Sequence, residues 1–114
     1  MGRAPDLDRL EEAVRKMGGS LTKEVEDAMQ KQAVLKDVFR VNHEIGRIAR
    51  EFPSMGPVLR DMQLEVNFVT IQTKRGGLGQ AREGYGRVLA SLDKVRSALT
   101  RASRDESLVL RKNL

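Results

Sequence analysis

The apolar residues of the C-terminal part of the chain follow a heptad spacing, and this spacing restricts the fold more than any other feature of the sequence. Apolar residues that alternate by three and four positions all lie on one side of an α-helix, as in helical bundles and coiled coils. The pattern predicts a helix over residues 79–104 and a tail over residues 105–114. Steps of three and four residues alternate without interruption through Leu78, Ala81, Tyr85, Val88, Leu92, Val95, Leu99 and Ala102.

A second apolar stripe predicts one long helix over residues 21–52. Pro53 and Pro57 end this helix, because proline lacks an amide hydrogen and its ring clashes with the preceding turn. The stripe changes phase near Gln32, so it is not one continuous heptad run. It begins with Leu21, Val25 and Ala28 and continues through Val34, Val38, Val41, Ile45, Ile48 and Phe52.

A third helix is predicted over residues 57–75. Its main apolar residues share one sector of a helical wheel. Residues 64–73 are also rich in β-branched side chains, so a strand is the alternative there. A lone strand would have no partner for its backbone hydrogen bonds, which favours the helix. The residues of the main sector are Val58, Leu59, Met62, Val66 and Val69.

A short first helix is predicted over residues 6–17. Pro5 and Asp6 suit the start of a helix. Gly18 and Gly19 suit its end, because glycine readily adopts the left-handed conformation of a C-cap. Ser20 would then cap the start of the next helix.

These elements predict an all-α fold in one domain, residues 1–114. A short N-terminal helix and three longer helices would form an elongated antiparallel bundle or coiled-coil hairpin. The composition agrees, because 39% of the 114 residues are apolar and 32% are charged, with few aromatic side chains. A chain of this length can bury one core but not two.

The reactive side chains argue against an enzyme or a metal protein. The chain has no Cys, and His43 is its only His. His43 and Glu44 could begin a zinc-protease motif, but Arg47 stands where the second His is required. No apolar run approaches the ~18 residues of a membrane span, and the N-terminus lacks the apolar segment of a signal peptide. We therefore expect no cofactor, no small-molecule substrate, and an intracellular location in the cytoplasm or the nucleus.

The glycine-rich stretch KRGGLGQAREGYGR, residues 74–87, could mark an anion site. It lacks the Lys-Ser or Lys-Thr ending of a phosphate-binding loop. Backbone amides at a helix start still favour an anion, and Lys74, Arg75 and Arg82 would form a basic shoulder beside them. The alternative is that Gly76 and Gly77 only form the turn between two helices.

Two further glycines of this stretch, Gly84 and Gly86, lie inside the heptad run on either side of Tyr85. Glycine costs a helix about 1 kcal/mol relative to alanine. Because it has no side chain, it also lets a neighbouring helix approach closely. We expect these positions either to permit such packing or to leave a mobile first turn.

The positive charge of the protein is concentrated in its last third. Residues 74–114 carry ten basic and four acidic side chains, whereas residues 1–52 carry ten of each. Arg87, Lys94 and Arg101 take the same heptad position and form one stripe. This stripe would bind nucleic-acid phosphates or an acidic partner, unless it is simply a solvated face.

Helix 57–75 carries a second apolar face, formed by Leu64, Phe68 and Ile71. Either other helices of the same chain or a second subunit must cover it. Together with the long heptads, this face predicts a non-enzymatic interaction module: a scaffold, adaptor or assembly subunit that packs its helices against itself or a partner protein. The alternative function is a nucleic-acid-associated protein that uses the basic C-terminal helix.

Overall fold

The computed structural model describes the backbone of residues 5–22 and 27–113 and the side-chain environment of residues 7–22 and 28–101. These residues form four α-helices, α1 (Pro5–Thr22), α2 (Asp27–Glu51), α3 (Gly56–Arg75) and α4 (Leu78–Asn113), and one short 3-10 helix, η1 (Pro53–Met55). The fold is therefore all-α, as the sequence predicts. Residues 64–73 are helical, which excludes the strand alternative.

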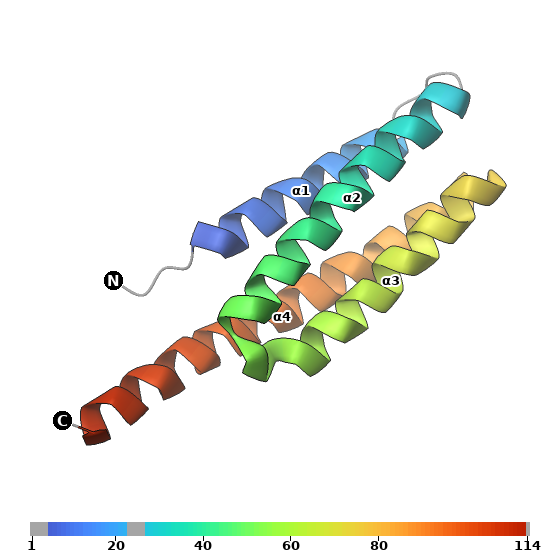
Figure 1. The fold of residues 1–114 in the computed structure, drawn as a ribbon. Coiled ribbons are helices and arrows are strands. Elements are labelled where there is room, and N and C mark those ends of the chain that lie inside the picture. Colours follow the sequence, from blue (N-terminus) through green and yellow to red (C-terminus); the bar gives the residue numbers. More distant parts are fainter. Residues whose placement is uncertain (1–4, 23–26, 114) are drawn as a thin grey trace.

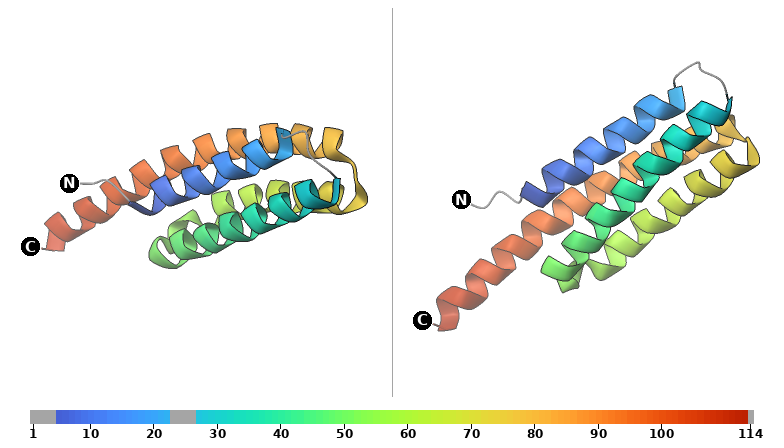
Figure 2. Two further views of the ribbon diagram at one scale, coloured as in Figure 1. Left: turned by 90° about the horizontal axis from the view of Figure 1, so that it is seen from above. Right: turned by 45° about the horizontal axis from the view of Figure 1, so that its top comes forward.

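The four helices run alternately up and down, and each packs against the next (Figures 1 and 2). The α1 helix also contacts α4, which closes the ring. The predicted long helices therefore do not pair as a two-helix hairpin: α2 and α4 lie diagonally across the bundle. The Cα atoms extend 59 Å along the longest axis and 21 and 18 Å across it. The C-terminal part of α4 projects beyond the bundle (Figure 2).

One apolar core runs through the bundle and receives side chains from all four helices. Burial of a large aliphatic side chain stabilises a fold by about 1.5–3 kcal/mol, so this shared core holds the helices together. Most of the predicted heptad positions of α4 are buried. The largest fully buried side chains are Leu10, Val14, Met17 and Leu21 of α1, Val34, Val41 and Ile48 of α2, Leu59, Met62, Val66 and Val69 of α3, and Val88 of α4.

The first helix is not short, and its predicted end at Met17 is wrong. α1 has 18 residues and continues through Gly18 and Gly19 to Thr22. The extra turn buries Leu21 completely, and Gly18 gives room to the Tyr85 ring of α4. The tertiary contact thus outweighs the tendency of two glycines to end a helix.

The predicted start of the second helix at residue 21 is also wrong, because Leu21 belongs to α1 and α2 begins at Asp27. Ser20 is not a helix cap. Its hydroxyl donates a 2.6 Å hydrogen bond to Oδ2 of Asp37 in α2. Val25, part of the predicted stripe, lies outside the described residues.

The α3–α4 turn has the geometry that its glycines predict. Gly76 is left-handed, with φ 82°, and its amide donates to the Thr73 carbonyl at 3.1 Å. The Gly77 amide donates to the Gln72 carbonyl at 2.8 Å. These two bonds satisfy the carbonyls at the end of α3 and reverse the chain into α4.

Residues 105–113 continue α4 and do not form the separate tail that we expect from the sequence. The chain has no Gly or Pro after Gly86, so no helix-breaking residue ends this helix.

Near the N-terminal end of α4, Gly84 packs closely against α3. A Cβ placed on it would lie 2.7 Å from Cδ1 of Phe68 and 3.0 Å from Cγ2 of Val69.

Gly84 and Gly86 should therefore respond oppositely to alanine. Gly84→Ala should lower the free energy of unfolding by about 1–3 kcal/mol, because the new methyl group overlaps Phe68 and Val69. A Cβ placed on Gly86 would meet no atom of another helix within 4 Å, so Gly86→Ala should raise stability by up to about 1 kcal/mol through helix propensity alone. Urea unfolding of the two variants measures both effects, and equal gains would contradict the close packing of Gly84.

The single tyrosine, Tyr85, offers a second test of the α1–α4 contact. Its burial raises the pKa of the phenol above the ordinary 10.0, and the charge of Arg15 acts in the opposite direction. The phenolate absorbance of the folded chain should therefore titrate above the midpoint found in denaturant. Between those two midpoints the folded state binds more protons, so stability should fall as the pH rises through them. Coincident midpoints would contradict the packing of Tyr85.

Candidate protein-interaction surface

The second apolar face of α3 is only partly covered in the structure. Leu64 is 61% exposed and Ile71 is 47% exposed. They are seven residues apart, which is about 10.5 Å along a helix. Two large aliphatic side chains one heptad apart are thus left in solvent on the outer side of α3.

Phe68, the third predicted member of this face, is covered from within the chain. Its half-buried ring borders Gly84 of α4, and the guanidinium carbon of Arg87 lies 4.5 Å from the ring centroid. Nε of Arg87 also donates a 2.8 Å hydrogen bond to Oε1 of Glu65. The structure therefore brings together Phe68 and Arg87, which the sequence places in two separate sites.

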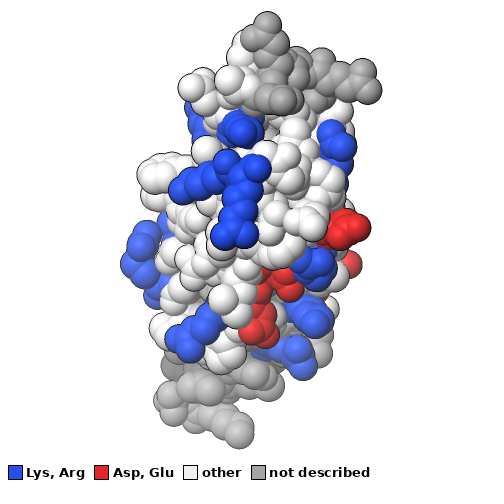
Figure 3. All heavy atoms as spheres, turned by 90° about the vertical axis from the view of Figure 1, so that its right-hand side faces the viewer, with Lys and Arg blue, Asp and Glu red and all other residues white. Residues whose placement is uncertain are grey.

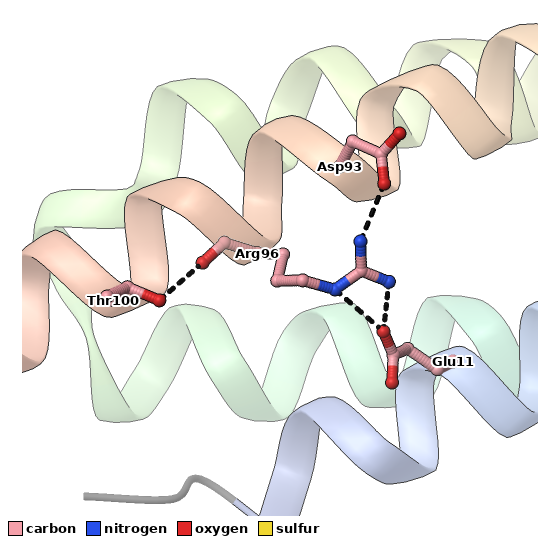
Figure 4. Close-up of polar contacts among 4 residues, drawn as sticks. All are labelled: Glu11, Asp93, Arg96 and Thr100. Carbon is pink, nitrogen blue, oxygen red and sulfur yellow. Dashed lines mark hydrogen bonds and ion pairs between the residues drawn. The ribbon is translucent and has the colours of Figure 1, made fainter.

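The predicted basic stripe is divided in the same way. All three side chains are exposed, but Arg87 bonds to Glu65 of α3, whereas Lys94 and Arg101 have no hydrogen-bond or ion-pair partner on another helix among the described residues. A neighbouring cation, Arg96, is engaged in a cross-helix network (Figure 4). It pairs with Glu11 of α1 and, at 2.6 Å, with Asp93, and these hydrogen bonds raise its pKa. The network lies at the surface, so it contributes little to stability but ties α1 to α4.

The three residues of the predicted anion shoulder do not act together. Lys74 and Arg75 are exposed at the end of α3. Nε of Arg82 instead donates a 2.9 Å hydrogen bond to the Leu21 carbonyl at the end of α1. A cation suits this position, because the C-terminal carbonyls of a helix carry partial negative charge.

Gln30 of α2 completes the same cap. Its side-chain amide is buried and donates to the carbonyls of Ser20 and Leu21 at 3.1 and 3.0 Å. Three side-chain hydrogen bonds from α2 and α4 thus satisfy two carbonyls at the end of α1. This explains how α1 ends without a glycine cap.

Gln30→Met should lower the free energy of unfolding by about 1–3 kcal/mol. Methionine keeps most of the volume but removes the donor, so buried carbonyls lose a hydrogen bond. Gln32→Met is the matched control, because Gln32 is exposed on the same helix and should tolerate the change. Urea unfolding gives both values, and a Gln30 variant as stable as the Gln32 variant would contradict the cap.

The sequence reasoning missed Phe39 of α2, which is 77% exposed and is the most exposed large apolar side chain among the described residues. It also missed a row of basic residues on the same helix, spaced by four, three, four and three residues with His43 in the middle. This helical spacing is visible in the sequence, on the side of α2 opposite its apolar stripe. The row consists of Lys36, Arg40, His43, Arg47 and Arg50.

Basic side chains also dominate one end of the molecule. Lys and Arg are spread over the face that Figure 3 shows, and its few Asp and Glu lie together toward the lower right. Exposed Lys74 and Arg75 lie at the α3–α4 turn, and Nζ of Lys31 is 3.6 Å from the position of a Cβ on Gly76. Cations of α2 and α3 therefore converge at the turn.

Two open grooves lie beside α1. One, of about 220 Å³ between α1 and α2, is lined by Arg9, Glu12, Ala13, Arg40, His43 and Glu44. Oε1 of Glu44 is buried there without a hydrogen bond, 3.8 Å from Nη1 of Arg47. The other groove, of about 320 Å³, runs between α1 and α4 beside Leu89 and Arg96. Among the residues with described side chains, no three His, Asp or Glu are grouped to hold a metal ion.

Within the described ranges, no helix is both long enough and apolar enough to cross a lipid bilayer. The chain matches no protein-family model, no curated protein and no solved structure in the comparisons made. Its function must therefore be argued from its own surface.

Proposed function

We propose that the chain is a non-enzymatic helical interaction module, a scaffold, adaptor or assembly subunit, that packs α3 against a helix of another subunit. The observation that carries this proposal is the exposure of Leu64 and Ile71 one heptad apart. Full burial of such a side chain contributes about 1.5–3 kcal/mol, so a partner helix would gain appreciable free energy by covering both. Phe68, whose ring lies beneath the guanidinium of Arg87, would lie between them along the helix.

The length of α4 supports the same proposal. Its heptad residues line the common core, whereas its C-terminal part projects beyond the other helices in Figure 2. We propose that this projecting part lengthens the molecule and allows helix packing with a partner, in an intracellular compartment. The partner is a protein or a second copy of this chain.

The test is the mass of the native assembly isolated from cells that express the chain. The wild-type chain should elute in a complex heavier than its 12.8 kDa. Leu64→Ser with Ile71→Ser should weaken that complex at least tenfold, because both apolar contacts are lost. Leu89→Ser is the matched control, since Leu89 is 41% exposed on α4 and lies outside this face. A wild-type monomer at its cellular concentration would refute the proposal.

The second candidate function is association with nucleic acid. It is favoured by the exposure of Lys94 and Arg101, one heptad apart on α4. The same native assembly distinguishes the two candidates. If nuclease treatment reduces its mass and Lys94→Gln with Arg101→Gln releases the nucleic acid, this second function is correct and the first is not.

A further inference from the structure

Phe39 of α2 lies at the same level of the bundle as the exposed face of α3. The two helices are antiparallel, and their two ends indicate the register. Lys31 of α2 lies beside Gly76, the cap of α3, at one end, and the short helix η1 joins Glu51 of α2 to Gly56 of α3 at the other. Counting inward from either end reaches the same pair, Phe39 opposite Phe68. Leu64 and Ile71 therefore lie about one turn to either side of this level.

Phe39 also points to the same side of the molecule. Successive residues of a helix are about 100° apart around its axis. Phe39 is therefore about 160° from Asp37, which bonds to α1, so it points away from α1. It is about 80° from Lys31, which lies beside Gly76 at the end of α3. On α3, Ile71 is about 160° from Val69, which borders Gly84 of α4. Phe39 and Ile71 thus both lie on the outer side of the α2–α3 pair, and Leu64 lies one heptad from Ile71 along α3.

Cations surround this apolar centre. Exposed Lys36 and Lys74 lie toward one end of the face, and exposed Arg50 and Arg60 lie toward the other. None of the ion pairs between described residues involves these four side chains. The face therefore has a solvent-exposed basic border, and no carboxylate among the described residues forms an ion pair with it.

Three of the five described carboxylates of α2 and α3 are directed away from this face, and exposed Glu51 lies at the end of α2, next to Arg50. Asp37 accepts from Ser20 of α1, and Glu65 accepts from Arg87 of α4. Glu44 is buried beside the α1–α2 groove. Of the described carboxylates of α3, Asp61 is the one at the margin, on the side of Leu64 that faces away from α2. The field over the apolar centre is thus positive.

From this arrangement we infer that the α2–α3 face binds an amphipathic helix of a partner protein whose apolar stripe is bordered by Asp and Glu. The inference rests on the proposed function and specifies its partner. Leu64 and Ile71 match apolar residues seven apart on the partner, and Phe39 fills the space between them. The cations at both ends pair with carboxylates one or two turns outside that stripe.

The same charges disfavour the other occupants. A second copy that docked through this face would bring two basic borders together, and like charges across an interface cost affinity. Single-stranded nucleic acid gains affinity from several aromatic planes, whereas this face offers one exposed aromatic ring and two aliphatic side chains. An acidic amphipathic helix would bury the apolar centre with its apolar stripe and pair its carboxylates with the basic border.

The inference is tested with two synthetic helical peptides of about 18 residues, or about five turns. Both carry Leu at heptad positions, one with Glu and the other with Lys at the flanking positions. The Glu peptide should bind and shift backbone amide resonances around Phe39, Leu64 and Ile71, and the Lys peptide should bind at least tenfold more weakly. Equal binding of the two peptides, or resonance shifts confined to other faces, would overturn the inference.

Variants of the full chain locate the site. Phe39→Ser, and separately Lys36→Glu with Lys74→Glu, should each weaken binding of the Glu peptide at least tenfold. All of these positions are exposed, so the fold should persist, as circular dichroism will show. Leu89→Ser is the control and should bind like the wild type. Unchanged binding by the Phe39 variant, or displacement of the peptide by RNA, would also overturn the inference.

These results separate the inference from the proposed function. A native assembly that survives Phe39→Ser and the charge reversals would leave the interaction module intact but assign its partner to another face. A wild-type monomer in cells would refute the proposed function whatever the peptides do.

Discussion

The close contact of α4 with both of its neighbours determines the geometry of the bundle. Two adjacent residues of α4 make it: the Tyr85 ring lies over Gly18 of α1, and the Phe68 ring of α3 lies over Gly84. Each contact places an aromatic ring where a glycine leaves room. Three helices are thereby held close enough to share one core, and α2 completes it with its own apolar stripe. The positions of the surface residues follow from this arrangement.

The same contacts between helices determine which basic side chains are paired within the chain and which remain exposed to a partner. Where helices meet closely, cations near the seam find partners on the neighbouring helix, as Arg87 does with Glu65 and Arg82 with the Leu21 carbonyl. The α2–α3 face has cations on its outer side, whereas Asp37 and Glu65 are turned toward α1 and α4. Positive charge therefore persists around Phe39, away from the C-terminal helix that is most basic in sequence. Net charge along the chain and charge on the folded surface are distributed differently.

The sequence was sufficient for the helical class, the α3–α4 turn and the core positions of α4. Each depends on local information: heptad spacing, and a glycine pair that adopts a known C-cap. The sequence was insufficient to place the end of α1. Gly18 lies inside this helix instead of ending it, because the Tyr85 ring of α4 occupies the space beside it. The sequence was also insufficient for the interaction surface. Phe39 belongs to no stripe on its own helix, so only the register with α3 relates it to Leu64 and Ile71.

The sequence by itself determined that four stretches form amphipathic helices, because burial of an apolar stripe requires a periodicity that the chain displays. Only the tertiary structure decided where α1 ends, which cations are neutralised, and which exposed apolar residues share one face. Those outcomes depend on contacts between residues far apart in the chain, such as Gln30 and Arg82 with the last carbonyls of α1. Helical periodicity sets the direction of each side chain within its own helix, and the antiparallel register then decides which side chains meet.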